Sequence, residues 1–487
     1  MMNHQTFDSS SDSRLEHLFI TEMRIYLLEH RPILVKFVYQ RKNTTMSPIR
    51  ARCLLVICLG LVGTGCDNSS TPTDNGNNDT TPALLQISDF SPADSCRSCH
   101  PNHYNEWSGS MHAYALKDPV FAAVRAVGQS AYAFALDGAC EKCHSPIGQR
   151  SGEIKWGPYN IADLSPQSQE GIGCDLCHTI TAINSISNAG IVLSPGDIKY
   201  GSIKDPAANN FHESEFHPLY HESAFCGACH DLITDNGLEL EAVYREWQQG
   251  GLAVTGKNCF DCHMETYQGP AATGGPVRTL HRHSMEGADL ALIDFPFKPE
   301  QLQGVTKLLR SALSMQVVAP AAVVAGEQLN FQIKLTNDNT GHNVPTGVPF
   351  NRQMWLSVIV QNQAGTELYS SGGLDANDDL MDEHSAFPFR DTALFNAQAT
   401  MLRADSTPTG ATWEAAYLTN PSIRAGETRT IDYGFVVPSG TIGNLNLRVA
   451  LLFRSFPPYV FRGLALDSLL PIPIISMAED TVLIATN

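Results

Sequence analysis

Residues 96–113 read CRSCHPNHYNEWSGSMHA and begin with two cysteines that are two residues apart and followed directly by a histidine. The same Cys-x-x-Cys-His pattern returns four more times, as CEKCH, CDLCH, CGACH and CFDCH. Ten of the thirteen cysteines belong to these five motifs. The motifs lie at 96–100, 140–144, 174–178, 226–230 and 259–263. The chain is therefore organised around a repeated cysteine chemistry.

The histidine after each second cysteine separates the kinds of site that such a motif can form. A structural zinc ion needs four ligands and would use Cys-x-x-Cys units in pairs, which leaves one unit over and gives the histidine no role. A disulfide framework gives it no role either. Covalent haem attachment uses every residue, because both thiols bind the haem vinyl groups and the histidine becomes the proximal iron ligand. The sequence therefore predicts five haem c groups.

The predicted attachment residues follow directly from the motifs. Thioether bonds to haem are expected at Cys96, Cys99, Cys140, Cys143, Cys174, Cys177, Cys226, Cys229, Cys259 and Cys262. Proximal ligation of the iron is expected of His100, His144, His178, His230 and His263.

Residues 46–66, MSPIRARCLLVICLGLVGTGC, have the pattern of a signal peptide. Two arginines precede the apolar run 53–62, and small residues follow it. The apolar run is too short to cross a bilayer as a permanent helix. We therefore expect export, with the true start at Met46 and residues 1–45 an untranslated extension or a long leader.

Cys66 stands where a bacterial lipoprotein is cleaved and acylated, after the small residues Thr64 and Gly65. The match to a lipobox is partial, because Gly63 occupies a position where leucine is usual. Two interpretations remain: a lipid at Cys66 that anchors the chain to a membrane, or simple secretion. Both place the protein in the periplasm or on the outer surface of a bacterial cell envelope.

Composition divides the chain into a leader (1–66), a flexible tether (67–88), a pentahaem domain (89–295) and a second domain (310–487). The tether is rich in Asp, Asn, Ser, Thr and Pro and has little to bury. The whole chain has 50 acidic and 32 basic residues. Nucleic acid and anionic membrane surfaces are poor partners for such a balance, whereas an acidic surface can select redox partner proteins.

Two further patterns lie within 89–295. The segments 118–136 and 238–249 have the apolar spacing of helices. A Tyr-x-Glu-Trp sequence follows both the first and the fourth motif, as YNEW at 104–107 and YREW at 244–247. The repetition suggests a duplicated unit that contains a pair of haems, although both tryptophans could serve the core alone.

The run CRSCH…YNEW…SMHAYAL, with CEKCHSPIG, GIGCDLCH, FCGACHD and NCFDCHM, resembles the multihaem c-type cytochromes related to the tetrahaem electron carrier of hydroxylamine oxidoreductase. The resemblance covers roughly residues 90–290. It implies that His112, in an S-x-H-A segment, is a distal haem ligand, and that His212 and His283 are distal ligands too. His221 is a further candidate for a distal ligand, and whether His217 is also a ligand stays open. His103 lies too close to His100 to reach the far side of the same haem.

The chain departs from that family by having a fifth motif and some 200 residues after it. Around Gly-containing turns, this tail alternates apolar and polar residues, which predicts an antiparallel β-sandwich. The fold class expected is therefore α+β and multidomain, with a mostly helical or irregular haem domain before the sandwich. The loop TGHNVPTG at 340–347 resembles loops that accompany haem domains in other multihaem cytochromes. His342 is accordingly either a haem ligand or part of a structural turn.

The acidic stretch DANDD at 375–379 resembles the start of a calcium-binding loop. Leu380 replaces the glycine that such a loop needs, and no glutamate follows at the twelfth position. A solvated acidic loop is the better interpretation.

Two functional classes remain. The first is an electron-transfer protein with closely spaced, mostly bis-histidine haems at the cell envelope. The alternative is an oxidoreductase in which one haem keeps an open iron and acts on a small nitrogen or sulfur compound. The surplus of histidines favours electron transfer. The sequence leaves open whether copies of the chain assemble into an oligomer or a conducting filament.

Overall fold

The computed structural model describes residues 19–25, 33–39, 85–131, 138–155, 157–386 and 390–487. The chain separates into two compact units, residues 1–80 and 81–487. In the first unit, β1 (Phe19–Ile25) pairs antiparallel with β2 (Ile33–Tyr39). The predicted signal peptide, Cys66 and most of the tether lie outside the described residues. The second unit contains all five motifs.

The haem motifs are built on single helical turns. The backbone N–H of the histidine donates to the carbonyl of the first cysteine in His100, His144, His178 and His230, over 2.8 to 3.1 Å. Residues at helical positions i, i+3 and i+4 lie on one face. Each such turn therefore presents both thiols and the imidazole to the same side.

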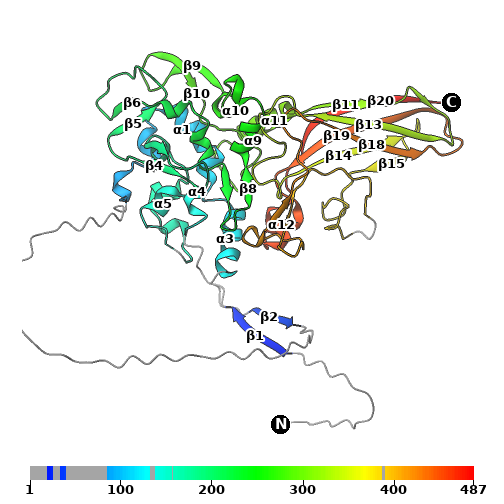
Figure 1. Ribbon diagram of the computed structural model, residues 1–487, viewed down its shortest axis with the longest axis horizontal. Coiled ribbons are helices and arrows are strands. Elements are labelled where there is room, and N and C mark those ends of the chain that lie inside the picture. The colour runs from blue at the N-terminus through cyan, green and yellow to red at the C-terminus, as the bar shows by residue number, and fades with distance from the viewer. Residues whose placement is uncertain (1–18, 26–32, 40–84, 132–137, 156, 387–389) are drawn as a thin grey trace, which may run out of the picture. The chain divides into compact units, whose positions relative to one another are not determined.

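The helices of this region include the motif turns themselves and the segments between them (Figure 1). They are α1 (Pro101–Ser108), α2 (Met111–Tyr114), α3 (Pro119–Ala131), α4 (Glu141–His144), α5 (Pro146–Arg150), α6 (Pro166–Gln169), α7 (Cys174–Cys177), α8 (Ala224–Gly227), α9 (Val243–Gln249) and α10 (Cys259–His263). The 3₁₀ turns of this region are η1 (Ile87–Asp89), η2 (Ala93–Cys96), η3 (Ile161–Asp163), η4 (Pro218–His221) and η5 (Ala253–Thr255).

Four two-stranded sheets accompany the helices. Their strands are β3 (Ile180–Ile183) with β4 (Ile191–Leu193), β5 (Ile198–Gly201) with β6 (Glu213–Phe216), β7 (Asp231–Ile233) with β8 (Glu239–Ala242), and β9 (Thr266–Pro270) with β10 (Val277–His281). The helix expected at 238–249 is wrong in its first part, because the alternating LELE segment pairs with β7 and buries Leu240. The helix expected at 118–136 is α3, as far as the chain is described there.

After α11 (Lys298–Ala312), the chain forms a β-sandwich. One sheet has the order β11-β13-β18 and the other β12-β20-β19-β14-β15. The strands are β11 (Ser314–Val318), β12 (Ala322–Val323), β13 (Gln328–Thr336), β14 (Gln353–Gln361), β15 (Glu367–Ser371), β18 (Thr428–Val436), β19 (Gly443–Arg454) and β20 (Ile475–Thr486). All neighbours are antiparallel except β12 and β20. The predicted α+β multidomain fold class is confirmed.

Alternating burial along the strands forms the sandwich core. In β13, Leu329, Phe331, Ile333 and Leu335 point inward, between residues that are exposed or half-buried. Across the pair, Phe331 lies opposite Tyr433, and the two rings stack with centroids 5.6 Å apart. This period-two pattern is the one that the sequence displays.

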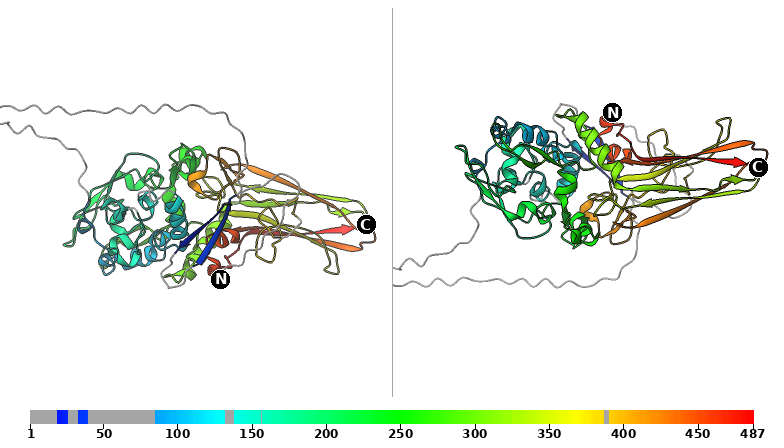
Figure 2. Two further views of the ribbon diagram at one scale, coloured as in Figure 1. Left: turned by 90° about the horizontal axis from the view of Figure 1, so that it is seen from below. Right: turned by 90° about the horizontal axis from the view of Figure 1, so that it is seen from above.

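Loops and short elements at the base of the sandwich lie beside the part of the chain that contains the motifs (Figure 2). These elements are β16 (Thr400–Leu402), β17 (Tyr417–Thr419), α12 (Pro458–Gly463) and the 3₁₀ turns η6 (Thr412–Glu414) and η7 (Asp467–Leu469). Val120 of α3 shares a buried cluster with Phe461 of α12, and Leu240 of β8 shares another with Phe350 and Met401. The two parts are thus joined by buried apolar contacts within one compact unit, and the boundary placed between 295 and 310 stays a prediction. Among the helices described, none combines the length and apolarity that crossing a bilayer requires.

Candidate haem-binding sites

The motif histidines are held by hydrogen bonds at Nδ1. A carbonyl oxygen can only accept, so Nδ1 carries the proton and Nε2 keeps its lone pair for a metal. The Nδ1 partners are Ala271 O at 2.7 Å for His100, Ala115 O at 2.9 Å for His144, Tyr200 O at 2.7 Å for His178 and Glu286 O at 2.6 Å for His263. These backbone bonds orient four of the five predicted proximal ligands.

Four of the motif histidines face a second imidazole from a distant part of the chain. Two ligands that bind one metal from opposite sides, each with nitrogen about 2 Å from the ion as for histidine on zinc, have ring centroids about 6 Å apart. The observed centroid distances are 6.2 Å for His100 and His212, 6.4 Å for His178 and His283, 6.1 Å for His230 and His112, and 6.2 Å for His263 and His342. The spacing fits an iron between each pair.

The second imidazoles are also prepared for metal binding. Three of them bond a backbone carbonyl through Nδ1: His212 with Glu213 O, His283 with His281 O and His342 with Asn343 O, at 2.8 to 3.0 Å. His112 Nδ1 lies 2.8 Å from Met285 Sδ. In all four, Nε2 remains available.

Burial keeps six of the buried imidazoles neutral. It lowers the pKa of His112 and of His342 to about 4 and that of His283 to about 3. Burial is also the largest cause of the lowered pKa of His144, His178 and His230. Because only the neutral ring has a lone pair to donate, the sites suit a metal at neutral pH.

His144 is the exception among the motif histidines. Its ring stacks on Phe121 with centroids 4.0 Å apart. Within the described part of the chain, no imidazole lies opposite His144 at the spacing of the four pairs, and the gaps at 132–137, 156 and 387–389 contain no histidine. The haem expected on 140–144 therefore has no second histidine among the residues described.

The remaining candidates are placed differently. His221, predicted as a ligand, directs Nε2 to Ser202 O at 3.2 Å and faces Phe216, so the structure does not bring it to a motif histidine. Its ligand role stays a prediction. The His103 ring lies 6.2 Å from that of His100, but its Nε2 bonds the Tyr267 hydroxyl at 3.2 Å. His212 is thus the better partner for His100.

The motifs lie next to one another in space. Thiols of different motifs lie close enough to act on one another's pKa in the pairs Cys96 with Cys174, Cys143 with Cys229, and Cys226 with Cys259. Cys177 lies close enough to Cys226 and Cys229 to act electrostatically on both. The first motif therefore neighbours the third, the third neighbours the fourth, and the fourth neighbours the second and the fifth. Each motif has another within short reach.

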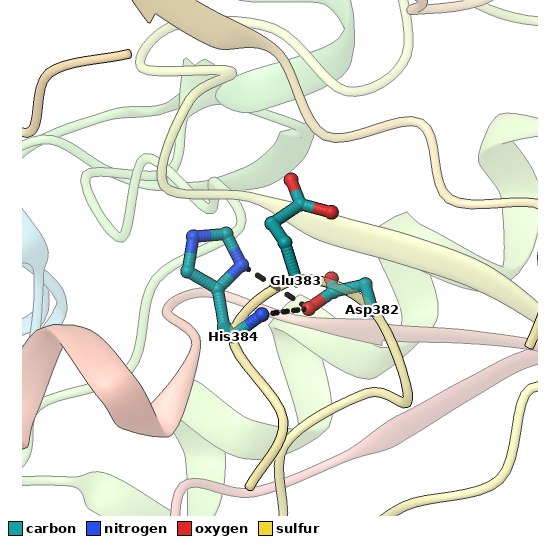
Figure 3. A group of neighbouring side chains, drawn as sticks. All are labelled: Asp382, Glu383 and His384. Carbon is teal, nitrogen blue, oxygen red and sulfur yellow. Dashed lines mark hydrogen bonds and ion pairs between the residues drawn. The ribbon is translucent and has the colours of Figure 1, made fainter. Parts of the chain in front are cut away.

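A group of side chains outside the motifs also has metal-ligating chemistry. The ligand atoms of Asp382, Glu383 and His384 lie within 4.8 Å of one another (Figure 3). Asp382 already accepts hydrogen bonds from the backbone N–H of His384 at 2.8 Å and from its Nδ1 at 3.1 Å. The His384 ring stacks on Tyr459, with centroids 3.7 Å apart. These contacts account for the group without a bound ion.

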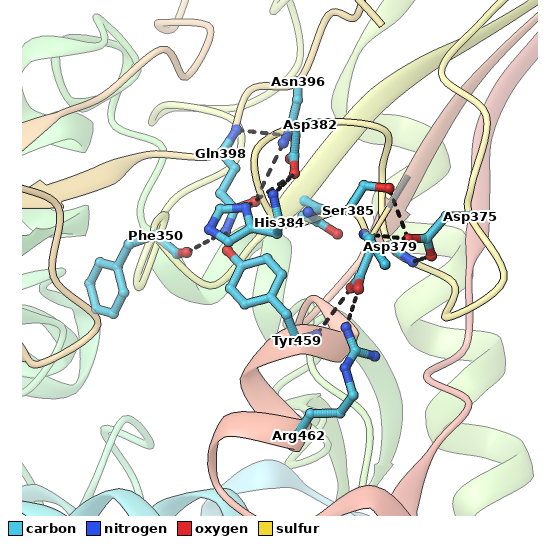
Figure 4. A network of polar contacts seen from close by, with 12 residues as sticks. Phe350, Asp375, Asp379, Asp382, His384, Ser385, Asn396, Gln398, Tyr459 and Arg462 are labelled. Atoms are coloured by element: carbon cyan, nitrogen blue, oxygen red, sulfur yellow. Dashed lines mark hydrogen bonds and ion pairs between the residues drawn. The ribbon is translucent and has the colours of Figure 1, made fainter. Parts of the chain in front are cut away.

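The neighbouring DANDD loop also uses its carboxylates internally (Figure 4). Asp375 accepts two backbone N–H groups through Oδ1, and Ser385 Oγ and a third N–H through Oδ2. Asp379 is 1% exposed, pairs with Arg462 and accepts the N–H of Tyr459. The expectation of a solvated loop is therefore wrong for Asp379, which anchors the loop to α12.

Comparisons with known proteins bear on the haem motifs and on the fold. A family model described as cytochrome c554 and c-prime matches residues 95–179, which contain the first three motifs. A solved structure of a penta-heme cytochrome c552 from Thermochromatium tepidum has a TM-score of 0.57 and 19% sequence identity, and the alignment covers 81% of this chain and 99% of that one. The chain has the fold of a multihaem c-type cytochrome.

Two further solved domains overlap 36% of this chain, a CARDB domain of the PF1109 protein from Pyrococcus furiosus and a PapD-like domain of human CEP192. Their identities are 8% and 10%, they are covered over 87% and 86% of their own length, and their TM-scores are 0.17 and 0.15. Likenesses this low carry no structural conclusion. A comparison with curated proteins found no match.

The pairing of histidines could not be predicted from the sequence. Rings that face each other come from distant segments, as His112 and His230 do, and nothing in either segment indicates its partner. The sequence did contain one repeated signal outside the motifs, namely the two Tyr-x-Glu-Trp segments.

Proposed function

We propose that this protein is an exported pentahaem cytochrome that passes electrons at the cell envelope through closely spaced haems. The ten motif cysteines would attach the haems, and the motif histidines would be the proximal ligands. His212, His283, His112 and His342 would be the distal ligands for the motifs that begin at 96, 174, 226 and 259, respectively. Bound haem iron would supply reversible one-electron chemistry.

The observation that carries the proposal is the set of four imidazole pairs with centroids 6.1 to 6.4 Å apart. Two axial histidines saturate an iron, so each such site favours electron transfer over substrate binding. The adjacency of the motifs supports transfer between them. The chain's five motifs also equal in number the haems of the penta-heme cytochrome c552 from Thermochromatium tepidum.

Replacing each distal candidate by alanine tests the ligand assignment. The variants H112A, H212A, H283A and H342A should each keep five haems by intact mass and convert one low-spin haem to high-spin by electron paramagnetic resonance. His217, whose ring contacts Tyr200 and Tyr220 and which is assigned no iron, provides the matched control as H217A. Unchanged spin states in all four variants would refute the assignment.

Export and lipid attachment need separate experiments. We propose that the sequence is cleaved before Cys66 and acylated there, which would leave the protein in the membrane fraction of a bacterial cell. C66S should then appear in the soluble periplasmic or external fraction. Retention of C66S in the membrane, or a mature N-terminus elsewhere, would argue against a lipid anchor at this residue.

His144 favours a second function for one of the five sites. With no histidine opposite it, the iron on 140–144 would have a position open to a small nitrogen or sulfur compound, as in a catalytic haem. The oxidised protein should then bind one cyanide per chain. Turnover of a compound such as nitrite or hydroxylamine would extend the proposal to catalysis, whereas absence of cyanide binding would remove it.

A further inference from the structure

The two Tyr-x-Glu-Trp segments make equivalent contacts, although they lie on different helices. Trp107 of α1 donates its indole N–H to Ile172 O at 2.8 Å, and Trp247 of α9 donates to Lys257 O at 3.2 Å. Both acceptors stand two residues before the first cysteine of a haem motif, at 174 and 259. Each tryptophan therefore holds the backbone that leads into a later motif.

The glutamates of the same segments hold the opposite side of the same two sites. Glu106 Oε2 accepts the backbone N–H of His283 at 2.9 Å, and its Oε1 accepts Arg282 Nη1 at 2.8 Å. His283 is the histidine that faces His178, in the motif approached by Trp107.

Glu246 of α9 makes equivalent contacts with the loop 340–347. Its Oε2 accepts the backbone N–H of Asn343 at 3.2 Å and its Oε1 accepts Asn343 Nδ2 at 2.8 Å. Thr346 donates a further hydrogen bond from its hydroxyl to Oε2. Asn343 follows His342, which faces His263 in the motif approached by Trp247.

The tyrosines complete the correspondence. Tyr104 packs in a cluster with Trp107 and Cys174. Tyr244 lies close enough to Cys259 for an electrostatic interaction between the two side chains. In each segment the tyrosine and tryptophan rings contact each other, with centroids 5.7 Å apart in the first and 5.4 Å in the second. The helices α1 and α9 thus place a tyrosine, a glutamate and a tryptophan in equivalent positions at two sites. At each site these side chains contact the segment before the motif and the segment of the facing histidine.

We infer that Glu106 and Glu246 are positioning residues, each of which, with the tryptophan that follows it, holds the two axial histidines of one haem in register. Because the glutamate and the tryptophan are adjacent on one helical turn, the proximal and distal segments are fixed to a common support. The inference rests on the proposed function, in that it takes His283 and His342 as iron ligands. The pairs of His112 and His212 have no such segment and depend on other contacts.

The test uses the full holoprotein and the variants E246A, E246Q and H342A, compared by electron paramagnetic resonance and by redox titration. E246A should retain five haems, because attachment needs only the cysteines. It should shift the potential, and lower the low-spin intensity, of the same single haem that H342A affects. E246Q keeps one acceptor oxygen and should shift that haem less. The matched control is E327A, which removes an exposed carboxylate from the turn before β13.

The outcomes separate the inference from the function on which it rests. If H342A changes one haem while E246A gives the spectrum and potentials of the wild type, the ligand assignment stands and the positioning role is refuted. If H342A itself changes nothing, both fail. Should E246A not mature, W247F keeps the ring and removes only the N–H donor. A shift confined to the same haem would support the inference, and an unchanged titration would overturn it.

Discussion

In the sandwich, buried apolar side chains form one continuous core, whereas in residues 89–295 they fall into several small separate clusters. Leu329, Leu356 and Leu447 belong to the continuous core and are fully buried. By contrast, one cluster around the first motif consists of Ala93, Trp107 and Ala113. The difference indicates that the sandwich is stabilised by its own side chains, and that the motif region depends on covalently bound haem for much of its interior.

The largest expected effect comes from removing haem attachment altogether. In a chain with all ten motif cysteines replaced by serine, residues 89–295 should lose their fold, because scattered clusters bury too little apolar surface to offset chain entropy. The sandwich should remain folded. Limited proteolysis followed by mass spectrometry should yield a protected fragment close to 310–487. Protection of the whole region from residue 89 onward would show that residues 89–295 do not need haem to fold, which would contradict the contrast with the sandwich.

A single core substitution in the sandwich should act on stability alone. L447A removes a fully buried side chain from the centre of the five-stranded sheet and should lower the free energy of unfolding by about 2–5 kcal/mol. The haem absorption spectrum should not change. The measurement is denaturant unfolding followed by far-ultraviolet circular dichroism. I442A, at a residue 82% exposed, is the control and should unfold like the wild type.

The contact between α9 and the loop 340–347 should link the stability of the protein to the potential of one haem. An added Cβ at Gly250, at the end of α9, would collide with the carbonyl oxygen of Gly341 in the loop that contains His342. G250A should therefore cost about 1–3 kcal/mol of stability. It should also shift the potential of the haem on 259–263. G410A, where a Cβ meets nothing, should do neither. A stability loss with all five potentials unchanged would mean that this contact does not position His342.

The smallest effect concerns pH and the loop around His384. Burial acts to lower the pKa of this imidazole, but the hydrogen bond and charge of Asp382 outweigh it and raise the pKa. A raised folded-state pKa adds stability that is complete below the unfolded pKa, about 6.5, and is lost as pH rises through the folded value. D382N should thus destabilise the protein by at most about 1 kcal/mol near pH 5.5 and hardly at all at pH 9, since solvent screens the pair. Equal losses at both pH values would contradict this sign.

The sequence predicted those features that depend on local pattern. The strands of the sandwich follow from alternating residues such as those of β13, and the motif turns follow from the Cys-x-x-Cys-His spacing. His112, His212, His283 and His342 were identified as candidates, and the structure brings each to a motif histidine.

Features that depend on distant contacts could not be predicted in this way. The sequence predicts helix where β8 lies, because the pairing of β8 with β7 is not visible in a single segment. The alternation of apolar and polar residues in β8 is visible there. The sequence offers His221 as a further candidate ligand, but its ring turns to Phe216 and Ser202. The isolation of His144 emerges only when every other described histidine has been placed in space.

Four of the five sites are expected to have two histidines, and the site of His144 one. Electron paramagnetic resonance of the oxidised holoprotein, with spins quantified per haem, tests this central claim most directly. We predict four low-spin haems and one high-spin haem per chain, because an iron with a single axial histidine is five-coordinate or holds a weak ligand. Five low-spin haems would contradict the claim, since the His144 iron would then have a strong second ligand; more than one high-spin haem would contradict the histidine pairs.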